Sequence, residues 1–132
     1  MKTNELMIGD WLFPYNETEP RRVEHLTYQY DMSGKYDAVA FDKNPYTFNY
    51  TGFCKPVPLT LEILERNGFR KVQDLYYMKS ENKIFPCPFF IEYNPNNNCL
   101  FINDGLIPMP ITYVHQLQHV IRLCGIEKEI IL

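Results

Sequence analysis

The residues best spaced for chemistry are His115 and His119, which lie four positions apart near the end of the chain. On a helix this spacing puts both imidazoles on one face beside Arg122, as in half of a metal site or a proton-transfer pair. Zinc sites of the H-E-x-x-H type use this spacing, but here two glutamines and a leucine intervene, so the general-base glutamate is missing. We therefore predict a polar, partly exposed helix face without metal, made of His115, Gln118, His119 and Arg122.

A cysteine nucleophile would be a second kind of chemistry. The four cysteines, Cys54, Cys87, Cys99 and Cys124, form no C-x-x-C pair and no Cys/His cluster at zinc-ligand spacing. The first residues, MKTNELMIGDW, hold no apolar stretch suited to a signal peptide. We therefore expect a cytoplasmic protein with reduced, mostly buried thiols. Cys87, between two prolines, is the most conspicuous thiol, and its pairing with a histidine stays open because spacing does not show proximity.

Serine and nucleotide chemistry lack their usual motifs. The two serines, Ser33 and Ser80, lie in predicted polar loops and not in a G-x-S-x-G turn. The sequence contains no G-x-G-x-x-G or G-x-x-x-x-G-K-[ST] loop, which excludes nucleotide binding by those devices. We assign no catalytic residue, no metal and no cofactor. An enzyme that uses His115, His119 or a cysteine is kept as the third functional alternative.

Aromatic residues are in surplus, with ten Tyr, nine Phe and one Trp. Several lie in or beside the predicted N-terminal strands, and Tyr and Trp are frequent in binding hot spots. The other interpretation is that these side chains line a core and its rim, because Tyr tolerates half-exposure. Both interpretations stay open. The candidate binding residues are Trp11, Tyr15, Tyr28, Tyr46 and Tyr50.

The charge balance bears on the class of partner. The formal net charge of −3 is unlike the basic footprint that phosphate binding normally requires. This argues against a nucleic-acid partner without excluding one, because a small basic face can lie within an acidic total. No stretch of the sequence is long and apolar enough to span a bilayer, so we expect no membrane partner.

The first half of the chain has the pattern of short strands. Apolar runs at 9–15, 22–28 and 36–42 are separated by turn residues. Between residues 46 and 51, three aromatic residues alternate with three polar ones, and this period of two puts the aromatic side chains on one face. Short strands at this spacing favour a small barrel of the SH3-like kind over residues 1–57.

Start and stop signals predict a short helix within residues 58–69. Thr60 follows two prolines and can cap the helix, and Gly68 suits the left-handed position past its end. Because the start and stop signals agree, this is the clearest local prediction in the chain.

A second helix follows from the same pattern. The segment PMPIT at 108–112 repeats the form of PVPLT at 56–60, so Thr112 is the predicted cap, and Gly125 ends the helix. The repetition is either a duplicated unit or, as we prefer, a convergent way to begin a capped helix. The last residues, GIEKEIIL, are either a final short strand or a docked tail.

Between the two helices, residues 73–79, 84–93 and 99–103 are typical of a three-stranded meander with polar turns. Pro86 and Pro88 lie two positions apart, so their missing N–H groups fall on one edge of the strand. This confines the segment to an edge strand or a bulge.

Three blocks of the sequence resemble short proteins of Bacteroides-type gut bacteria, their prophages and other mobile elements. The blocks are NELMIGDW near the start, PLTLEILERNGF in the middle and YVHQLQHVIRLCGIEKEIIL at the end. The resemblance implies a cytoplasmic bacterial or phage-linked protein. No activity is established for that set, so it offers no catalytic residues to carry over.

Together these patterns predict one α+β domain over residues 1–132. Its parts are a β-rich region at 1–57, a helix at 58–69, a three-stranded antiparallel meander within 70–107, and at 108–132 a helix packed on the sheet and a tail. We expect a non-enzymatic binding module for a protein partner or a second copy of itself, using an aromatic face of the first half. Nucleic-acid binding by a small barrel is the second alternative.

Overall fold

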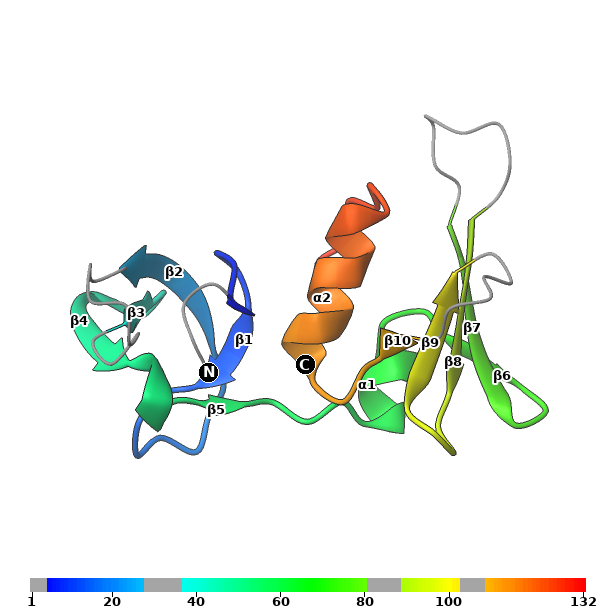
Figure 1. The fold of residues 1–132 in the computed structure, drawn as a ribbon, viewed down its shortest axis with the longest axis horizontal. Helices are drawn as coiled ribbons and strands as arrows, with labels where there is room; N and C mark the ends of the chain where they lie inside the picture. The colour runs from blue at the N-terminus through cyan, green and yellow to red at the C-terminus, as the bar shows by residue number, and fades with distance from the viewer. Residues whose placement is uncertain (1–4, 28–36, 81–88, 103–108) are drawn as a thin grey trace. The chain divides into compact units, whose positions relative to one another are not determined.

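The chain consists of two compact units, Met1–Val57 (unit 1) and Pro58–Leu132 (unit 2). Each unit holds a five-stranded antiparallel sheet, and the described part of unit 2 adds two α-helices, so the predicted α+β class is confirmed (Figure 1). The boundary between the units falls at the end of the β-rich region that the sequence delimits at residue 57. The computed structural model describes residues 5–27, 37–80, 89–102 and 109–132.

The strands of unit 1 are β1 (Trp11–Phe13), β2 (Arg21–Thr27), β3 (Ala38–Phe41), β4 (Asn44–Tyr50) and β5 (Lys55–Pro56). Their order in the sheet is β4-β3-β2-β1-β5, and each strand runs antiparallel to its neighbours. This order leaves β4 and β5 as the two edges of an open sheet. The strand prediction for this half is therefore confirmed, whereas the SH3-like barrel is not.

The core of unit 1 is built mainly on β2 and β3. All four residues of β3 are buried, and a register shift between Val23 and His25 of β2 accompanies the packing of both Val23 and Leu26, three apart, in one cluster. Across the sheet, Val23 of β2 pairs with Phe41, and Leu26 pairs with Val39. The buried cluster consists of Leu6, Leu12, Val23, Val39, Phe41 and Cys54.

The strands of unit 2 are β6 (Arg70–Val72), β7 (Leu75–Ser80), β8 (Phe89–Asn94), β9 (Cys99–Ile102) and β10 (Met109–Pro110). Their order is β10-β9-β8-β7-β6, so the predicted meander is present as the three central strands. The edge strands β6 and β10 were not predicted, because three and two residues are too few to show a period. The prediction about Pro86 and Pro88 lies outside the described residues.

The two faces of this second sheet differ in character. Tyr76 and Met78 of β7, and Ile91 and Tyr93 of β8, are buried on one face. The residues between them in sequence point to the opposite face, which is polar and aromatic. The sheet therefore covers its core with one side only.

Helix α1 (Leu61–Arg66) begins and ends as predicted. The Thr60 hydroxyl oxygen accepts the backbone N–H three residues further on, at 3.3 Å. Past the other end, Gly68 has a φ of 91°, and the Phe69 N–H donates to the Leu64 carbonyl at 3.0 Å. This is the Schellman arrangement, which needs a residue without a Cβ at the left-handed position.

Helix α2 (Val114–Leu123) begins one residue later than predicted, because Tyr113 and not Thr112 is its N-cap. The Gln116 side-chain oxygen accepts both the Thr112 N–H (2.8 Å) and the Tyr113 N–H (3.1 Å), so it satisfies donors that a threonine cap would have left open. The far end closes at Gly125 (φ 70°) with the same Schellman bonds as α1. That α2 packs on the sheet stays a prediction.

The two similar segments that precede the helices contact each other. The Leu59 N–H donates to the Thr112 carbonyl at 2.9 Å, and Pro58 forms an antiparallel bridge with Tyr113. Prolines keep both segments extended, and extended segments can exchange backbone hydrogen bonds. The repeated motif therefore aligns the starts of the two helices within unit 2.

The end of the chain is a docked tail and not a strand. Asn67, the C-cap of α1, is 2% exposed, and its amide binds the tail backbone in both directions. The Ile131 N–H donates to Asn67 Oδ1 (2.8 Å), and Asn67 Nδ2 donates to the carbonyls of Ile131 and Ile63 (2.7 Å each). The Lys128 ammonium also donates to the Asn67 carbonyl. Ile130, which lies between Lys128 and Ile131 in the sequence, is 1% exposed.

We expect Asn67→Ala to destabilise the protein by about 3 kcal/mol, because three hydrogen bonds of about 1 kcal/mol each are lost. Denaturant unfolding of the full chain measures this change. Asn96→Ala, at an exposed turn position, is the matched control and should change stability by less than about 0.5 kcal/mol. Equal, small effects of both substitutions would show that Asn67 does not hold the tail.

Candidate functional site

The alternating aromatic residues of β4 lie on a face that is open to solvent. Tyr46, Phe48 and Tyr50 are 91%, 49% and 49% exposed. The register of β4 with β3 shifts between Asn44 and Asn49, so it is the shared exposure of these three side chains, and not the strand period, that groups them. Tyr46 therefore lies outside any core, whereas the half exposure of Phe48 and Tyr50 fits both a binding face and the rim of a core.

Two further aromatic residues join this face from outside the strand. Phe53 and Tyr15 are 57% and 54% exposed, and their ring centres are 5.2 Å apart. Phe53 also lies 6.2 Å from Tyr50, with both pairs in tilted geometry. Tilted pairs at these distances are favourable contacts between aromatic rings. We call the set of Tyr15, Tyr46, Phe48, Tyr50 and Phe53 the aromatic surface.

A short 3₁₀ turn, Thr51–Phe53, positions Phe53 directly after β4. The buried Thr51 donates its N–H to the Asp37 carbonyl at 2.9 Å, and Cys54 donates its N–H back to Thr51 at 3.2 Å. On β3, the small residue Ala38 lies directly opposite Tyr50. A small neighbour leaves room for the Tyr50 ring to lie over the sheet.

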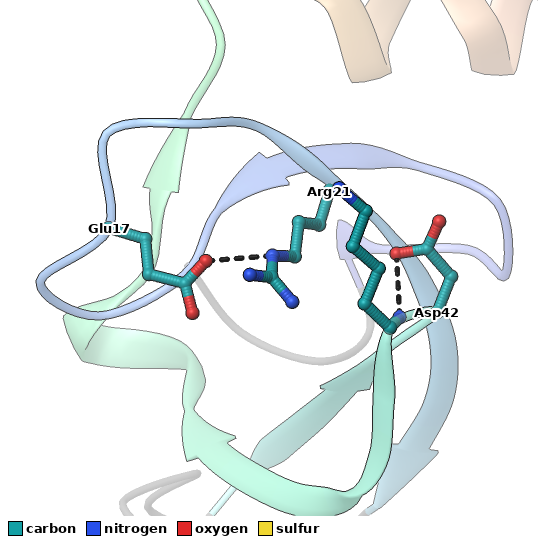
Figure 2. A network of polar contacts seen from close by, with 4 residues as sticks. Glu17, Arg21 and Asp42 are labelled. Atoms are coloured by element: carbon teal, nitrogen blue, oxygen red, sulfur yellow. Dashed lines mark hydrogen bonds and ion pairs between the residues drawn. The ribbon is translucent and has the colours of Figure 1, made fainter.

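The turn that carries Tyr15 is held by polar contacts. Asn16 adopts a φ of 59°, which asparagine tolerates better than most residues, and the Glu17 N–H donates to the Pro14 carbonyl at 3.1 Å. The Glu17 carboxylate lies 2.7 Å from Arg21 Nε at the start of β2, and Figure 2 draws this ion pair. A partly exposed ion pair of this kind is worth at most about 1 kcal/mol, so it orients the turn more than it stabilises the unit.

A second polar contact in Figure 2 precedes β4. The Asp42 carboxylate accepts the Lys43 N–H at 3.0 Å within the two-residue turn that joins Phe41 to Asn44. An aspartate that accepts a neighbouring N–H stabilises such turns. The strand that carries three of the five aromatic residues therefore starts from a defined turn.

Trp11, another predicted binding residue, lies on β1 and not on β4 or its adjoining turns. Trp11 is half-buried on β1, and the Arg22 guanidinium lies 4.9 Å from the centre of its ring across the strand pair. This cation–π contact already occupies one ring face. Tyr28 lies outside the described residues. Phe48 was recognisable from its alternation, whereas Phe53 gave no signal because a 3₁₀ turn has no strand period.

The structure corrects the prediction of a partly exposed polar face on α2. His115 and Gln118 are each 6% exposed, so the expected partial exposure is wrong for these two, while His119 and Arg122 are half-buried. The reason is that α2 is buried on its apolar stripe and on part of its polar side as well. The His115 ring lies edge-on to His119 at 5.7 Å and stacks with Tyr113 at 6.0 Å. Among the described residues, no group of three or more His, Cys, Asp or Glu could hold a metal.

The described thiols differ from activated cysteines. Cys54 is 6% exposed, and burial raises its pKa from the ordinary 9.0 to about 11. Its thiol donates to the Tyr50 carbonyl at 3.6 Å. Burial also raises the pKa of Cys124. Reactive cysteines need a lowered pKa, so these two have the character of structural thiols. Cys87 lies outside the described residues.

Comparison of the chain with protein-family models, with curated proteins and with solved structures found no match. In the part of the chain that the structure describes, neither helix is long and apolar enough to cross a membrane. These comparisons therefore add no information about function.

The raised pKa of Cys54 predicts slow alkylation of the folded protein. With a pKa near 11 the neutral thiol is favoured in the native state, and at pH 8 the thiolate fraction falls roughly 100-fold below that of an ordinary thiol. For the same reason, the stability that this thiol contributes is complete below pH 9 and is lost as the pH rises through 11. Peptide mapping after timed iodoacetamide treatment measures the rate of Cys54 alkylation, and denatured protein is the control. Equal rates in folded and denatured protein would contradict the burial argument.

Proposed function

We propose that the protein is a non-enzymatic binding module that takes a partner protein on the aromatic surface of unit 1. One observation carries this proposal: Tyr15, Tyr46, Phe48, Tyr50 and Phe53 are each about half exposed or more and lie on one strand and its adjoining turns. Soluble proteins rarely expose a contiguous patch of large apolar side chains without a use for it.

The size of the surface supports a real interface. Aromatic side chains bury roughly 150–250 Å² each, so five that are half exposed present on the order of 500 Å². That is most of the roughly 800 Å² that one partner contributes to a standard interface. Burying this area, at about 25 cal/mol per Å², would stabilise a complex by about 12 kcal/mol before the cost of association is subtracted. That is enough for specific binding.

The position of β4 supports an extended segment as the part of the partner that binds. Among the described strands, β4 pairs only with β3, so one side of its backbone is open. Sheet edges are usually protected by lysine, proline or a bulge. In β4 the proline (Pro45) and the register shift lie before Asn49, and the end of the strand, Asn49–Tyr50, pairs regularly with β3 and carries neither proline nor charge. A partner strand added there would gain backbone hydrogen bonds beside the aromatic side chains.

The resemblance of the chain's ends and centre to bacterial and prophage proteins supports a role in the cytoplasm of a bacterium or in its mobile elements. A second copy of this chain is one partner that an exposed edge and apolar face can serve. A nucleic acid would instead need cations beside the aromatic rings. The five members of the aromatic surface include no cation.

We expect the double substitution Tyr50→Ser and Phe53→Ser to weaken partner binding at least tenfold, because hot-spot aromatics cost about 2 kcal/mol or more each when truncated. The partner is first captured from host lysate with and without nuclease, then purified and titrated against each variant. Leu123→Ser, at an 87% exposed position of unit 2, is the control and should leave the affinity unchanged.

Three outcomes would contradict the proposal. Capture that disappears on nuclease treatment would favour the nucleic-acid alternative. A partner whose affinity is unchanged by the double substitution would show that another surface binds it. A monomeric hydrodynamic size together with no captured protein would leave the aromatic surface without a binding role.

A further inference from the structure

A second candidate site lies on unit 2, on the solvent face of β6, β7 and β8. A hollow of about 640 Å³ opens there. Its volume is within the range of roughly 300–1,000 Å³ that is usual for small-molecule sites. It is lined by Gly68 and by the side chains of Arg70, Val72, Tyr77, Lys79, Phe90 and Glu92.

The register of the strands explains why these residues meet. Arg70 of β6 lies opposite Tyr77 of β7, which lies opposite Glu92 of β8. In the next row, Lys79 of β7 lies opposite Phe90 of β8. Directly opposed residues of antiparallel strands place their side chains on the same face. One row therefore holds a cation, a phenol and a carboxylate, and the other a cation beside an aromatic ring.

The charges in the hollow are not neutralised by one another. In the described part of the chain, no carboxylate lies within ion-pair distance of Arg70 or Lys79, and Glu92 has no cationic partner. The Lys79 ammonium lies 6.0 Å from the centre of the Phe90 ring. Two cations against one carboxylate leave a net positive charge, which favours an anionic group in the ligand.

The aromatic and apolar lining favours a flat ring in the same ligand. Phe90 is 45% exposed and Val72 is 53% exposed, and Tyr77 lies between the two cations on the sheet. Exposed aromatic side chains on a sheet face are platforms on which a base can stack, at roughly 1–3 kcal/mol per base.

We propose that this hollow binds a nucleotide: a phosphate joined to a base that carries an exocyclic amino group. Arg70 and Lys79 bind the phosphate, Phe90 and Tyr77 take the base, and the Glu92 carboxylate accepts a hydrogen bond from the amino group. An aromatic carboxylate explains the cations but leaves Glu92 without a donor. The site is separate from the aromatic surface of unit 1 and does not depend on the function proposed for it.

The first test titrates the full chain with adenosine monophosphate, uridine monophosphate and inorganic phosphate by calorimetry. We expect adenosine monophosphate to bind about tenfold tighter than uridine monophosphate, because uracil lacks the exocyclic amino group that would donate a hydrogen bond to Glu92. Inorganic phosphate should bind more weakly than both. Absence of nucleotide binding at millimolar concentration overturns the proposal, and equal affinity for the two nucleotides overturns the role of Glu92.

The second test compares neighbouring cations on one strand. Arg70→Ala should weaken adenosine monophosphate binding about tenfold, since one charged hydrogen bond to phosphate is worth about 1.5–3 kcal/mol. Lys71→Ala is the matched control, because Lys71 is exposed but points away from the hollow, and it should change the affinity less than twofold. Equal losses for both variants would indicate general electrostatic attraction and would overturn the site.

Two further variants assign the remaining roles. Phe90→Leu should weaken both nucleotides through lost stacking, and Glu92→Gln should reduce the preference for adenine over uracil. Unchanged affinity and preference in these variants would overturn the assigned pose. Circular dichroism spectra that match the wild type show that each variant is folded, which the location of these side chains outside the core allows.

A free nucleotide and a single-stranded nucleic acid would present the same chemical groups to the hollow. Titration with an oligonucleotide distinguishes the two ligands. If a single strand is the natural ligand, an adenine oligonucleotide binds tighter than the mononucleotide, and its affinity falls steeply with salt. If the free nucleotide is the ligand, the oligonucleotide gains nothing over it. Either result supports the site, provided that Arg70→Ala weakens the binding.

Discussion

The buried amide of Asn67 is the interaction on which unit 2 most depends. It caps α1, accepts the N–H of Ile131 and donates to two carbonyls, so it connects positions 64 residues apart in the chain. A buried primary amide is costly unless its donors and acceptors are satisfied, and here the tail supplies the partners. The Schellman turn at Gly68 leads directly from this residue into β6 at Arg70. One cap therefore holds the end of the chain and also sets where the first strand of the second sheet begins.

The two sheets use aromatic residues in opposite ways. In unit 2, Tyr76 and Tyr93 are 3% exposed and form part of the core, whereas in unit 1 the aromatic residues of β4 face solvent. In the described residues of unit 1, the buried cluster consists of aliphatic side chains, Cys54 and one aromatic residue, Phe41. Its outer aromatic residues are thus not needed for packing, which is the physical reason for assigning them to a partner. The energy of such a surface is released only when another molecule covers it.

Catalysis receives little support from the described residues. Burial keeps the Cys54 and Cys124 thiols protonated, and His115 lies inside the protein in contact with aromatic neighbours. The outer face of β6, β7 and β8 holds polar groups that are open to solvent in a concave site. Their mixture of cations, rings and one carboxylate is suited to recognising a ligand and lacks a nucleophile.

Local sequence patterns predicted the ends of both helices, the alternation in β4 and the central meander. Each of these features depends on residues a few positions apart. The same patterns misplaced one cap, since Gln116 accepts the N–H groups of Thr112 and Tyr113 and the helix begins at a Tyr113 cap. Only the tertiary structure decided that the aromatic side chains of β4 are exposed, that His115 is buried, and that Asn67 meets Ile131. It also decided that Arg70, Tyr77 and Glu92 form one row. These outcomes depend on strand register and on long-range burial, and neither leaves a periodic mark in the sequence.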